Sequence, residues 1–383
     1  MELSMAVLGA GMQGTASGYD FARFGASRVL MLDVDPARAR ASADRINALV
    51  GRAVATHGAV DARDGSAVTR CLAGVRCVLS GAPYRLNEGL ARAALAAGSS
   101  FGDLGGNTDV VLRELALDPE ARAQGVSLVP DLGLAPGMGN TLAVYCMNQV
   151  EGPRHVHVRC GGLPQTPRPP LDYKLVFSVE GLTNEYFGEA VYLQGGRRVT
   201  VDTFDALEKV SWEGVGELEA FSTSGGTSTC PWTFEGKLDT YDYKTLRYPG
   251  HHARVKLLKD LGFLDLEAVD LGGTRVVPRE LFHALARKHL DFPEDRDLVL
   301  LRVVCEGARE RFTAEILDRH DEATGFTAME RTTGFPAAIV CLMMARGEVP
   351  PGAHPLEKAV DPARFVAELG LRGITLRERR EPL

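Results

Sequence analysis

The 383-residue sequence predicts an α/β protein, in which a doubly wound parallel sheet is followed by a second α+β domain with a mainly antiparallel sheet. Three observations support this fold class. The glycine-rich segment 9–14 directly follows the apolar run 4–8. Strand-like and helix-like segments alternate up to about residue 150, as they do around parallel sheets. Beyond that point, apolar and polar residues alternate with a period of two, which indicates antiparallel strands.

The first apolar run predicts a strand that leads into Gly9-Ala10-Gly11-Met12-Gln13-Gly14 and then into a helix. Gly9 permits a tight turn, Gly11 lets the backbone approach a pyrophosphate, and Gly14 lets the helix pack closely on its strand. The free N–H groups and the positive dipole end of that helix favour phosphate binding. The segment therefore predicts a Rossmann-type dinucleotide site that includes Met12 and Gln13 as well as the three glycines.

The second predicted strand, 28–32, ends at Asp33, close to the ~20-residue offset expected of the acid that binds the adenosine ribose. A carboxylate there accepts hydrogen bonds from the ribose hydroxyls, and it repels a 2′-phosphate. The sequence therefore favours NAD over NADP as the cofactor. Arg38 lies near enough in sequence to soften that repulsion.

The rest of the first third continues the alternation of strands and helices. A helix is predicted over 36–50, and the pattern adds strands at 52–56, 77–80, 99–103 and 126–129 and a helix at 86–97. In such sheets, ligands bind outside the carboxyl ends of the strands. We expect the cofactor to contact Asp61, Gly81 and Ala82 at this rim, which also carries Asp103, Asn107 and Asp131.

The second part of the chain predicts a different architecture. Period-two strands are expected at 155–160, 174–179, 190–193, 198–201, 298–305 and 311–317, and helices at 254–261 and 278–288. Residues 306–309 read as a hairpin turn, and the tail reads as helices at 335–346 and 361–369. We therefore expect a dinucleotide-binding domain over 1–150, a substrate and dimerisation domain over 151–330, and C-terminal helices over 331–383 that return to the first domain.

Composition narrows the classes of partner. A hydrophobic content of 45% with 24% charged residues is ordinary for a soluble globular protein, and the net charge of −7 disfavours nucleic acid. No apolar run is long enough to span a bilayer, and the N-terminal residues do not resemble a signal peptide. The seven cysteines are odd in number and include no Cys-x-x-Cys pair, so we expect reduced thiols in a cytoplasmic protein without a membrane partner.

Several segments resemble the saccharopine dehydrogenase family, and together they span nearly the whole chain. Besides residues 9–14, they are Gly81-Ala82-Pro83, Asp131 to Gly137, Gly161 to Pro164, Pro169 to Lys174, Thr245 to His251, and Thr333 to Ala338. The segments over 161–174 and 245–251 look most like the lysine 6-dehydrogenase branch. Ala135 departs from saccharopine reductases, which tend to have Asp at that position of the loop.

The resemblance implies an activity and an organisation. The activity would be NAD-dependent oxidative deamination of the ε-amino group of L-lysine, giving a semialdehyde that cyclises, with release of ammonia. Family members place the amino-acid substrate in a cleft between the two domains, and they are commonly dimers, so a homodimer is expected.

Proton transfer needs its own residues, because hydride leaves carbon only when the nitrogen lone pair is free. A free ammonium has a pKa near ~10.4, so the site must lower that pKa or supply a base. Asp131 and Asp103 at the rim, and Lys174 among apolar neighbours, are the catalytic candidates. The same carboxylates could instead hold the ammonium by charge or bond to loop N–H groups, and Lys174 could be a solvated strand-edge lysine.

Substrate binding is assigned to four residues. With the resemblance, Arg247 is the candidate for the α-carboxylate, because a guanidinium fork donates two parallel charge-assisted bonds; without it, a surface ion pair would be the simpler interpretation. Tyr173 and His251 are candidates for a proton relay or a substrate contact, and His251 is expected to titrate near the working pH. Asn107 follows the flexible Gly105-Gly106 pair at the same rim.

Two other functions remain open. Saccharopine dehydrogenase activity would require more cations for three carboxylates, and Arg85, Arg168 and Lys237 are available; one arginine in the cleft favours lysine and three favour saccharopine. The third possibility is a non-catalytic NAD-binding module.

No metal site is predicted. His155 and His157 share one face of a strand, but no third ligand is evident. Cys160 and Cys230 are interpreted as packing residues, because hydride transfer needs no thiol nucleophile.

Overall fold

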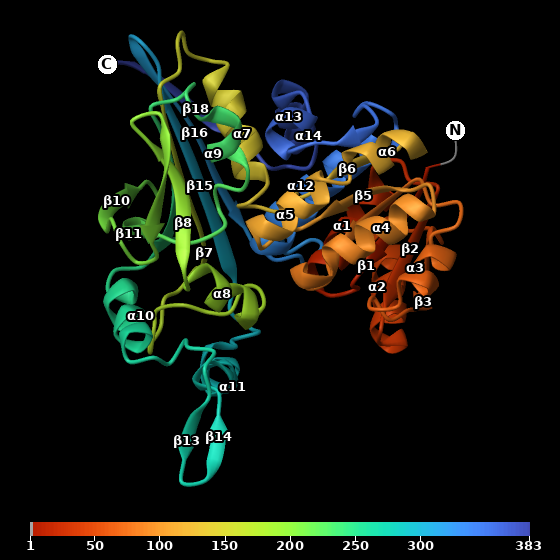
Figure 1. Cartoon of the computed structure of the whole chain (residues 1–383), viewed down its shortest axis with the longest axis horizontal. Coiled ribbons are helices and arrows are strands. Elements are labelled where there is room, and N and C mark those ends of the chain that lie inside the picture. The colour runs from red at the N-terminus through yellow and green to blue at the C-terminus, as the bar shows by residue number, and fades with distance from the viewer. Residues whose placement is uncertain (1–2) are drawn as a thin grey trace.

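The computed structural model describes residues 3–383 and contains two large sheets with helices packed around them (Figure 1). The first sheet has seven strands in the order β17-β6-β5-β4-β1-β2-β3, and every pairing is parallel. The strand order reverses between β1 and β4, which in such sheets opens a ligand crevice at the carboxyl ends. The strands are β1 (Ser4–Leu8), β2 (Arg28–Asp33), β3 (Ala55–Ala59), β4 (Cys77–Ser80), β5 (Ser100–Asp103), β6 (Ser127–Val129) and β17 (Gly352–Ala353).

Helices connect these strands, and local sequence explains where they begin and end. The Asp35 side chain accepts hydrogen bonds at the start of α2 (Pro36–Val50), and Gly51 ends that helix in a left-handed conformation. Asn107 caps α5 (Thr108–Leu115) in the same way. The remaining helices of this domain are α1 (Met12–Arg23), α3 (Gly65–Cys71), η1 (Tyr84–Leu86), α4 (Asn87–Ala96) and α6 (Asp118–Gln124).

The second sheet has nine strands in the main order β10-β11-β12-β7-β15-β16-β18, with β8 beside β12 and β9 beside β8. Only the β12–β7 pairing is parallel, so the sheet is mainly antiparallel, as the sequence predicts. Glu306 pairs with Arg311 across the predicted hairpin turn. The strands are β7 (His155–Pro164), β8 (Glu189–Gln194), β9 (Arg197–Asp202), β10 (Glu208–Trp212), β11 (Gly216–Ser222), β12 (Thr240–Arg247), β15 (Asp297–Glu306), β16 (Glu310–Arg319) and β18 (Arg377–Pro382).

Helices also cover this second sheet. The helix α7 (Met138–Met147) lies on β7 and β15, where a side chain at Gly139 would touch Val158 and Leu301 at 3.4 and 3.5 Å. A small hairpin, β13 (Val269–Leu271) and β14 (Thr274–Val276), projects from the lower end of the molecule (Figure 1). The other helices are α8 (Val179–Glu185), α9 (Cys230–Phe234), α10 (His251–Asp260) and α11 (Pro278–Leu290).

The C-terminal segment joins both domains. The helix α12 (Ala328–Ala345) packs against α1, and the Ser17 hydroxyl donates to the Gly334 carbonyl at 3.1 Å. After α13 (Leu356–Ala359) and α14 (Pro362–Leu371), the buried Arg372 pairs with Asp20 of α1 at 2.9 Å. We expected residues 331–383 to return to the first domain. The last strand, β18, instead pairs with β16 of the second sheet.

One strand prediction was wrong, and a second predicted strand begins at Ala55 instead of at residue 52. Residues 174–179 form a loop into α8, because the Lys174 ammonium and the Leu175 amide bond to the carbonyls of Asp295 and Leu290 rather than to a strand. The third strand of the first sheet runs from Ala55 to Ala59 instead of over 52–56, because the Asn47 side chain binds the chain at Val54 and Ala55 and so delays its entry into the sheet.

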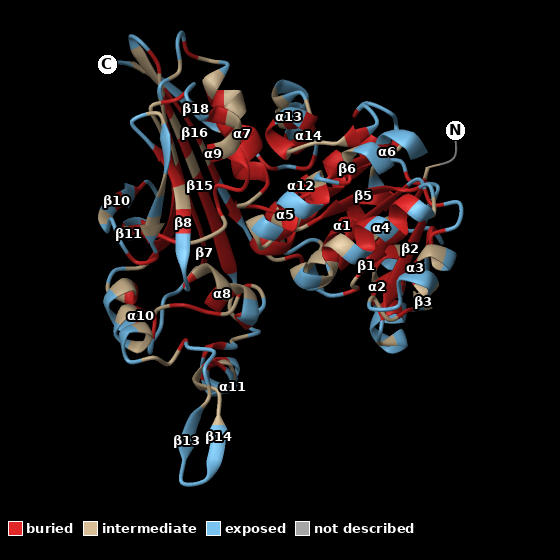
Figure 2. Cartoon of the chain, viewed as in Figure 1, coloured by how far each residue is buried: buried red, intermediate tan, exposed pale blue. Residues whose placement is uncertain are grey.

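Buried residues concentrate in the sheet strands and in α1, α7 and α12, as Figure 2 shows. Within residues 3–383, no helix combines the length and apolarity that a bilayer crossing requires. The same residues contain no group of three or more His, Cys, Asp or Glu side chains suited to a metal ion.

Candidate functional site

A cleft of 590 Å³ lies at the carboxyl ends of the parallel strands, and both domains line it. The first domain contributes Gln13, the 81–85 segment and Gly105-Gly106. The second domain contributes polar and apolar side chains from the segments around β7, α8 and β12, including Cys160, Phe177, Glu185, Tyr243 and Arg247. Met329 and Thr333 of α12 complete the wall between the two domains.

The three glycines of segment 9–14 form a cradle and differ in the space that each leaves for a side chain. Gly9 has a φ of +99°, and a side chain there would lie 2.9 Å from the Gly81 backbone. A side chain at Gly14 would lie 1.9 Å from the Gly9 carbonyl oxygen. In contrast, a side chain at Gly11 would meet no atom of the described chain within 4 Å. Gly11 therefore faces open space at the start of α1, where a pyrophosphate would accept hydrogen bonds from free backbone N–H groups.

Three further side chains mark the dinucleotide site. The Asp33 carboxylate is buried at the end of β2, where it accepts hydrogen bonds of 2.9 Å from the Ala10 and Asp35 amides. The Arg38 guanidinium is 3.8 Å from that carboxylate. Gln13 lines the cleft, and within residues 3–383 its buried Oε1 has no hydrogen-bond partner. These residues fit a dinucleotide, with the carboxylate beside the glycine turn.

Of the other predicted cofactor contacts, Gly81 and Ala82 line the cleft, and Met12 is exposed at the start of α1. Asp61 follows β3 on the surface, where its ion pair with Arg63 at 2.6 Å holds the pKa of the carboxyl at about 2.

Asp103 and Asp131 lie beneath the cleft and do not line it. Both carboxyls are buried, and burial raises the pKa of Asp103 to about 6 and that of Asp131 to about 7. Asp103 accepts from the Gly105 amide at 2.6 Å, and Asp131 accepts from the Ser228 hydroxyl. Burial beside these acids also raises the pKa of Glu114 to about 11. The acids therefore support the Gly105-Gly106 turn from below.

Lys174 and Asn107 also differ from their expected positions, since neither lines the cleft. The Lys174 ammonium donates to the Asp295 carbonyl at 2.6 Å, which directs it toward the loop after α11. The Asn107 side chain accepts from the Val110 amide at 3.2 Å and so caps α5.

Arg247 is the predicted substrate residue that reaches the cleft. It ends β12 and is buried, with its guanidinium carbon 4.9 Å from the Tyr173 ring centre and 5.6 Å from the Tyr186 ring centre. Nε donates to the Tyr186 hydroxyl at 2.8 Å, and Nη1 donates to the Leu246 carbonyl at 2.8 Å. A guanidinium has five N–H donors, so Nη1 and Nη2 keep N–H groups for a ligand carboxylate.

Donor and acceptor chemistry fixes the direction of the network behind Arg247. His251 Nδ1 lies 3.1 Å from the Leu171 carbonyl, which can only accept, so Nδ1 carries the proton. Nε2 is then the acceptor, and the Tyr186 hydroxyl donates to it at 2.9 Å. This chain ends on a backbone carbonyl, so it holds Arg247 in place and transfers no net proton.

The expectation that His251 titrates near the working pH was wrong. The ring is buried, and burial together with the Arg247 charge lowers its pKa to about 3. His251 is therefore neutral at physiological pH, which its role as acceptor from Tyr186 requires.

Sequence reasoning missed Glu185 and Tyr186, which lie at the end of α8. Glu185 lines the cleft, and its Oε2 is 3.9 Å from Arg247 Nη2. Burial in the cleft raises the pKa of Glu185 to about 7. No local motif marks these two residues, because only the tertiary structure brings the end of α8 to Arg247.

The histidines and cysteines behave as ordinary structural residues. His155 and His157 each bond across to β12, to Thr240 at 3.0 Å and to Asp242 at 2.8 Å. All seven cysteines are free. Cys160 lines the cleft, but burial raises the pKa of its thiol to about 12, so it stays protonated.

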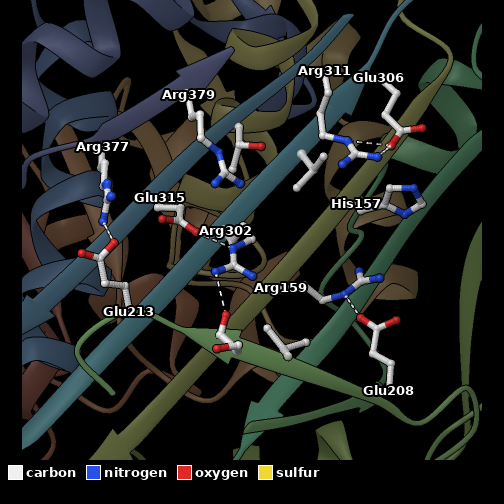
Figure 3. A pocket seen from close by; sticks show the side chains of 14 residues that line it. His157, Arg159, Glu208, Glu213, Arg302, Glu306, Arg311, Glu315, Arg377 and Arg379 are labelled. Carbon is white, nitrogen blue, oxygen red and sulfur yellow. Dashed lines mark hydrogen bonds and ion pairs between the residues drawn. The ribbon is translucent and has the colours of Figure 1, made fainter. Parts of the chain in front are cut away.

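A second hollow, of 680 Å³, lies on the outer face of the second sheet and shares no lining residue with the cleft (Figure 3). Arginines and glutamates alternate across it and pair with one another, as in Arg302 with Glu315 and Arg377 with Glu213. The face therefore compensates its own charges and presents no single-sign surface to a polyanion.

The parallel sheet, the open glycine cradle and the buried Asp33 define the class of protein: a two-domain protein whose first domain binds a nicotinamide dinucleotide. The saccharopine dehydrogenase NADP binding domain profile matches residues 5–129, and the saccharopine dehydrogenase C-terminal domain profile matches residues 133–374. The chain belongs to the saccharopine dehydrogenase family, which confirms the resemblance.

Individual relatives are distant. The glutamate-forming, NADP-dependent saccharopine dehydrogenase of Saccharomyces cerevisiae is 27% identical over 236 residues, covering 55% of this chain and 49% of the yeast enzyme. The α-aminoadipic semialdehyde synthase of Arabidopsis thaliana is 25% identical over 170 residues, covering 40% of this chain and 15% of that protein. The chain thus matches about half or less of these relatives.

A solved structure confirms the fold class. Apo saccharopine dehydrogenase from Saccharomyces cerevisiae superposes with a TM-score of 0.77 at 21% identity, covering 99% of this chain and 100% of that one. At this identity, the similarity establishes the two-sheet architecture alone.

Proposed function

We propose that the protein catalyses NAD-dependent oxidative deamination of the ε-amino group of L-lysine. The amine, NAD and water give the 6-semialdehyde, ammonia, NADH and a proton, and the semialdehyde then cyclises. A bound nicotinamide supplies the hydride acceptor. The chain itself supplies an anchor for the carboxylate, apolar side chains in the cleft lining and the dinucleotide cradle.

The observation that carries the proposal is the cation content of the cleft. Arg247 is a buried guanidinium with free N–H groups there, and Arg85 lies exposed at the rim. Arg168 instead pairs with Asp295, and Lys237 is exposed away from the cleft lining. One well-held carboxylate is what lysine requires, whereas saccharopine carries three.

The apolar residues of the cleft lining favour a neutral amine. Leu104, Leu134, Ala135, Pro136, Phe177 and Met329 are among the residues that line the cleft. Such surroundings disfavour an ammonium and lower its pKa, which frees the lone pair that hydride departure needs. Asp103, Asp131 and Lys174 lie outside the lining, so we assign them no direct contact with the amine.

The choice of NAD rests on Asp33. Its carboxylate is held at the end of β2 by two backbone amides, where it would accept bonds from the ribose and repel a 2′-phosphate. Arg38 at 3.8 Å partly offsets that repulsion.

The second candidate is saccharopine dehydrogenase activity. The yeast relative bears that name, and Arg85 supplies a second guanidinium at the rim of the cleft. A non-catalytic NAD-binding role is the third candidate.

Purified protein with L-lysine or saccharopine, each with NAD and NADP, tests the proposal. We expect reduced cofactor and ammonia in equal amounts from L-lysine. Reduced cofactor and glutamate from saccharopine, with nothing from lysine, would replace the proposal with the second candidate. Cofactor binding without turnover of either amine would favour the third.

We also propose a homodimer in the cytoplasm. The seven free cysteines fit a reducing compartment. The outer face of the second sheet carries both charge signs, so a second copy related by a two-fold axis could exchange some of these ion pairs across an interface. Light scattering of the wild type should give twice the chain mass, and Arg302→Glu should give the single-chain mass; a wild-type monomer would contradict the proposal.

A further inference from the structure

The cleft contains a carboxylate whose position is informative. Glu185 is 28% exposed, and its Oε2 lies 3.9 Å from Arg247 Nη2. This separation is longer than a hydrogen bond, so the two charges do not saturate each other. Among residues 3–383, the Glu185 carboxylate forms no ion pair other than this long one with Arg247. A guanidinium and a carboxylate side by side at a cleft wall are arranged to receive a ligand anion next to a ligand cation.

The spacing of the pair suits the head of an α-amino acid. An α-ammonium nitrogen is two bonds from the carboxylate carbon, ~2.5 Å away. When Nη2 of Arg247 holds the carboxylate, an ammonium at that distance can lie on the side of the guanidinium where Glu185 lies, 3.9 Å from Nη2. The ε-nitrogen of an extended lysine is six bonds from the same carbon, ~7.5 Å away. An extended lysine anchored on Arg247 therefore carries its reacting amine ~7.5 Å from the head group that Glu185 adjoins.

The surroundings of Glu185 agree with this placement. Burial in the cleft raises the pKa of the carboxyl to about 7, and an ammonium in contact would stabilise the ionised form. Tyr173 and Tyr186 flank the guanidinium, and burial keeps both phenols protonated. Neither ring therefore competes for a substrate cation by charge.

We propose that Glu185 and Arg247 together hold the α-ammonium and the α-carboxylate of the substrate, so that the site selects a zwitterionic amino acid over a plain carboxylate with the same chain. This inference rests on the proposed function for the identity of the amine-bearing chain. The contact of Glu185 and Arg247 with the α-ammonium and α-carboxylate does not depend on the reaction that the enzyme then catalyses.

The test compares L-lysine with 6-aminohexanoate, which is lysine without its α-amino group. Glu185→Gln preserves shape and removes the charge. Glu180→Gln is the matched control, because Glu180 also lines the cleft but is exposed and paired with Arg287. We expect Glu185→Gln to raise KM for L-lysine by about 10- to 100-fold, as loss of a charge-assisted bond does, with kcat nearly unchanged. The constants for 6-aminohexanoate should not change, and Glu180→Gln should match the wild type.

Binding by calorimetry to the protein–NADH complex separates this inference from the proposed reaction. A wild-type preference for L-lysine over 6-aminohexanoate that Glu185→Gln abolishes supports the inference, even if no ammonia is ever released. Failure of turnover with that preference intact refutes the proposed function alone. The inference is overturned if the wild type shows no such preference, if both ligands lose affinity equally in Glu185→Gln, or if kcat falls while KM stays constant. Glu185→Asp, with the charge retained, should keep part of the preference and controls for misfolding.

Discussion

Replacing Tyr186 by phenylalanine tests the network that holds Arg247. The lost hydroxyl accepts from Arg247 Nε at 2.8 Å and donates to His251 Nε2 at 2.9 Å, and both partners are buried. The variant therefore leaves a charged donor and a neutral acceptor without partners. Such groups cost about 1–3 kcal/mol each, and more when charged, so we expect a loss of about 3–5 kcal/mol in the free energy of unfolding.

Urea unfolding at neutral pH measures that loss. Tyr145→Phe is the matched control, because its hydroxyl donates to Glu378 at an exposed position, and it should cost less than about 1 kcal/mol. Tyr186→Phe should also raise KM for L-lysine, since the guanidinium is no longer held from behind. A variant as stable as Tyr145→Phe, with an unchanged KM, would refute the proposed role of the network.

Three further predictions concern the cofactor site and the buried acids. Gly11→Ala should fold normally yet lose at least ~10-fold in cofactor affinity by calorimetry, because its side chain would enter the open phosphate space, whereas Gly14→Ala should not fold. Normal cofactor binding by Gly11→Ala would contradict this. Asp33→Asn should shift the ratio of kcat/KM from NAD toward NADP by ~10-fold, since Arg38 would then meet the 2′-phosphate unopposed; an unchanged ratio would count against the ribose role. Glu114 has its pKa raised to about 11 in the folded state, so its contribution to stability is present below the unfolded pKa and is lost as pH rises. Between pH 5 and 7.5, the free energy of unfolding of Glu114→Gln, measured with urea, should therefore rise by up to about 3 kcal/mol relative to that of the wild type. Parallel pH profiles of stability for the two proteins would contradict this explanation.

The carboxyl ends of the parallel strands show why part of the site was predictable. Gly9, Gly14 and Asp33 act within one strand–helix–strand unit, so their spacing along the chain specifies their contacts. The rule that ligands bind at this rim also located Gly81 and Ala82 correctly on the cleft lining. The rule was insufficient for Asp103 and Asp131, because it places a residue at the rim without saying whether the side chain turns outward or down into the core.

The amino-acid sequence by itself determined the two-sheet fold class, the glycine cradle and the family, because those signals are local and repeat along the chain. Only the tertiary structure decided which polar groups meet in the cleft. Arg247, Tyr186, His251 and Glu185 come from α8, β12 and α10, and the packing of these elements sets their contacts. That packing depends on burial summed over whole faces of helices and sheets, which no short motif encodes.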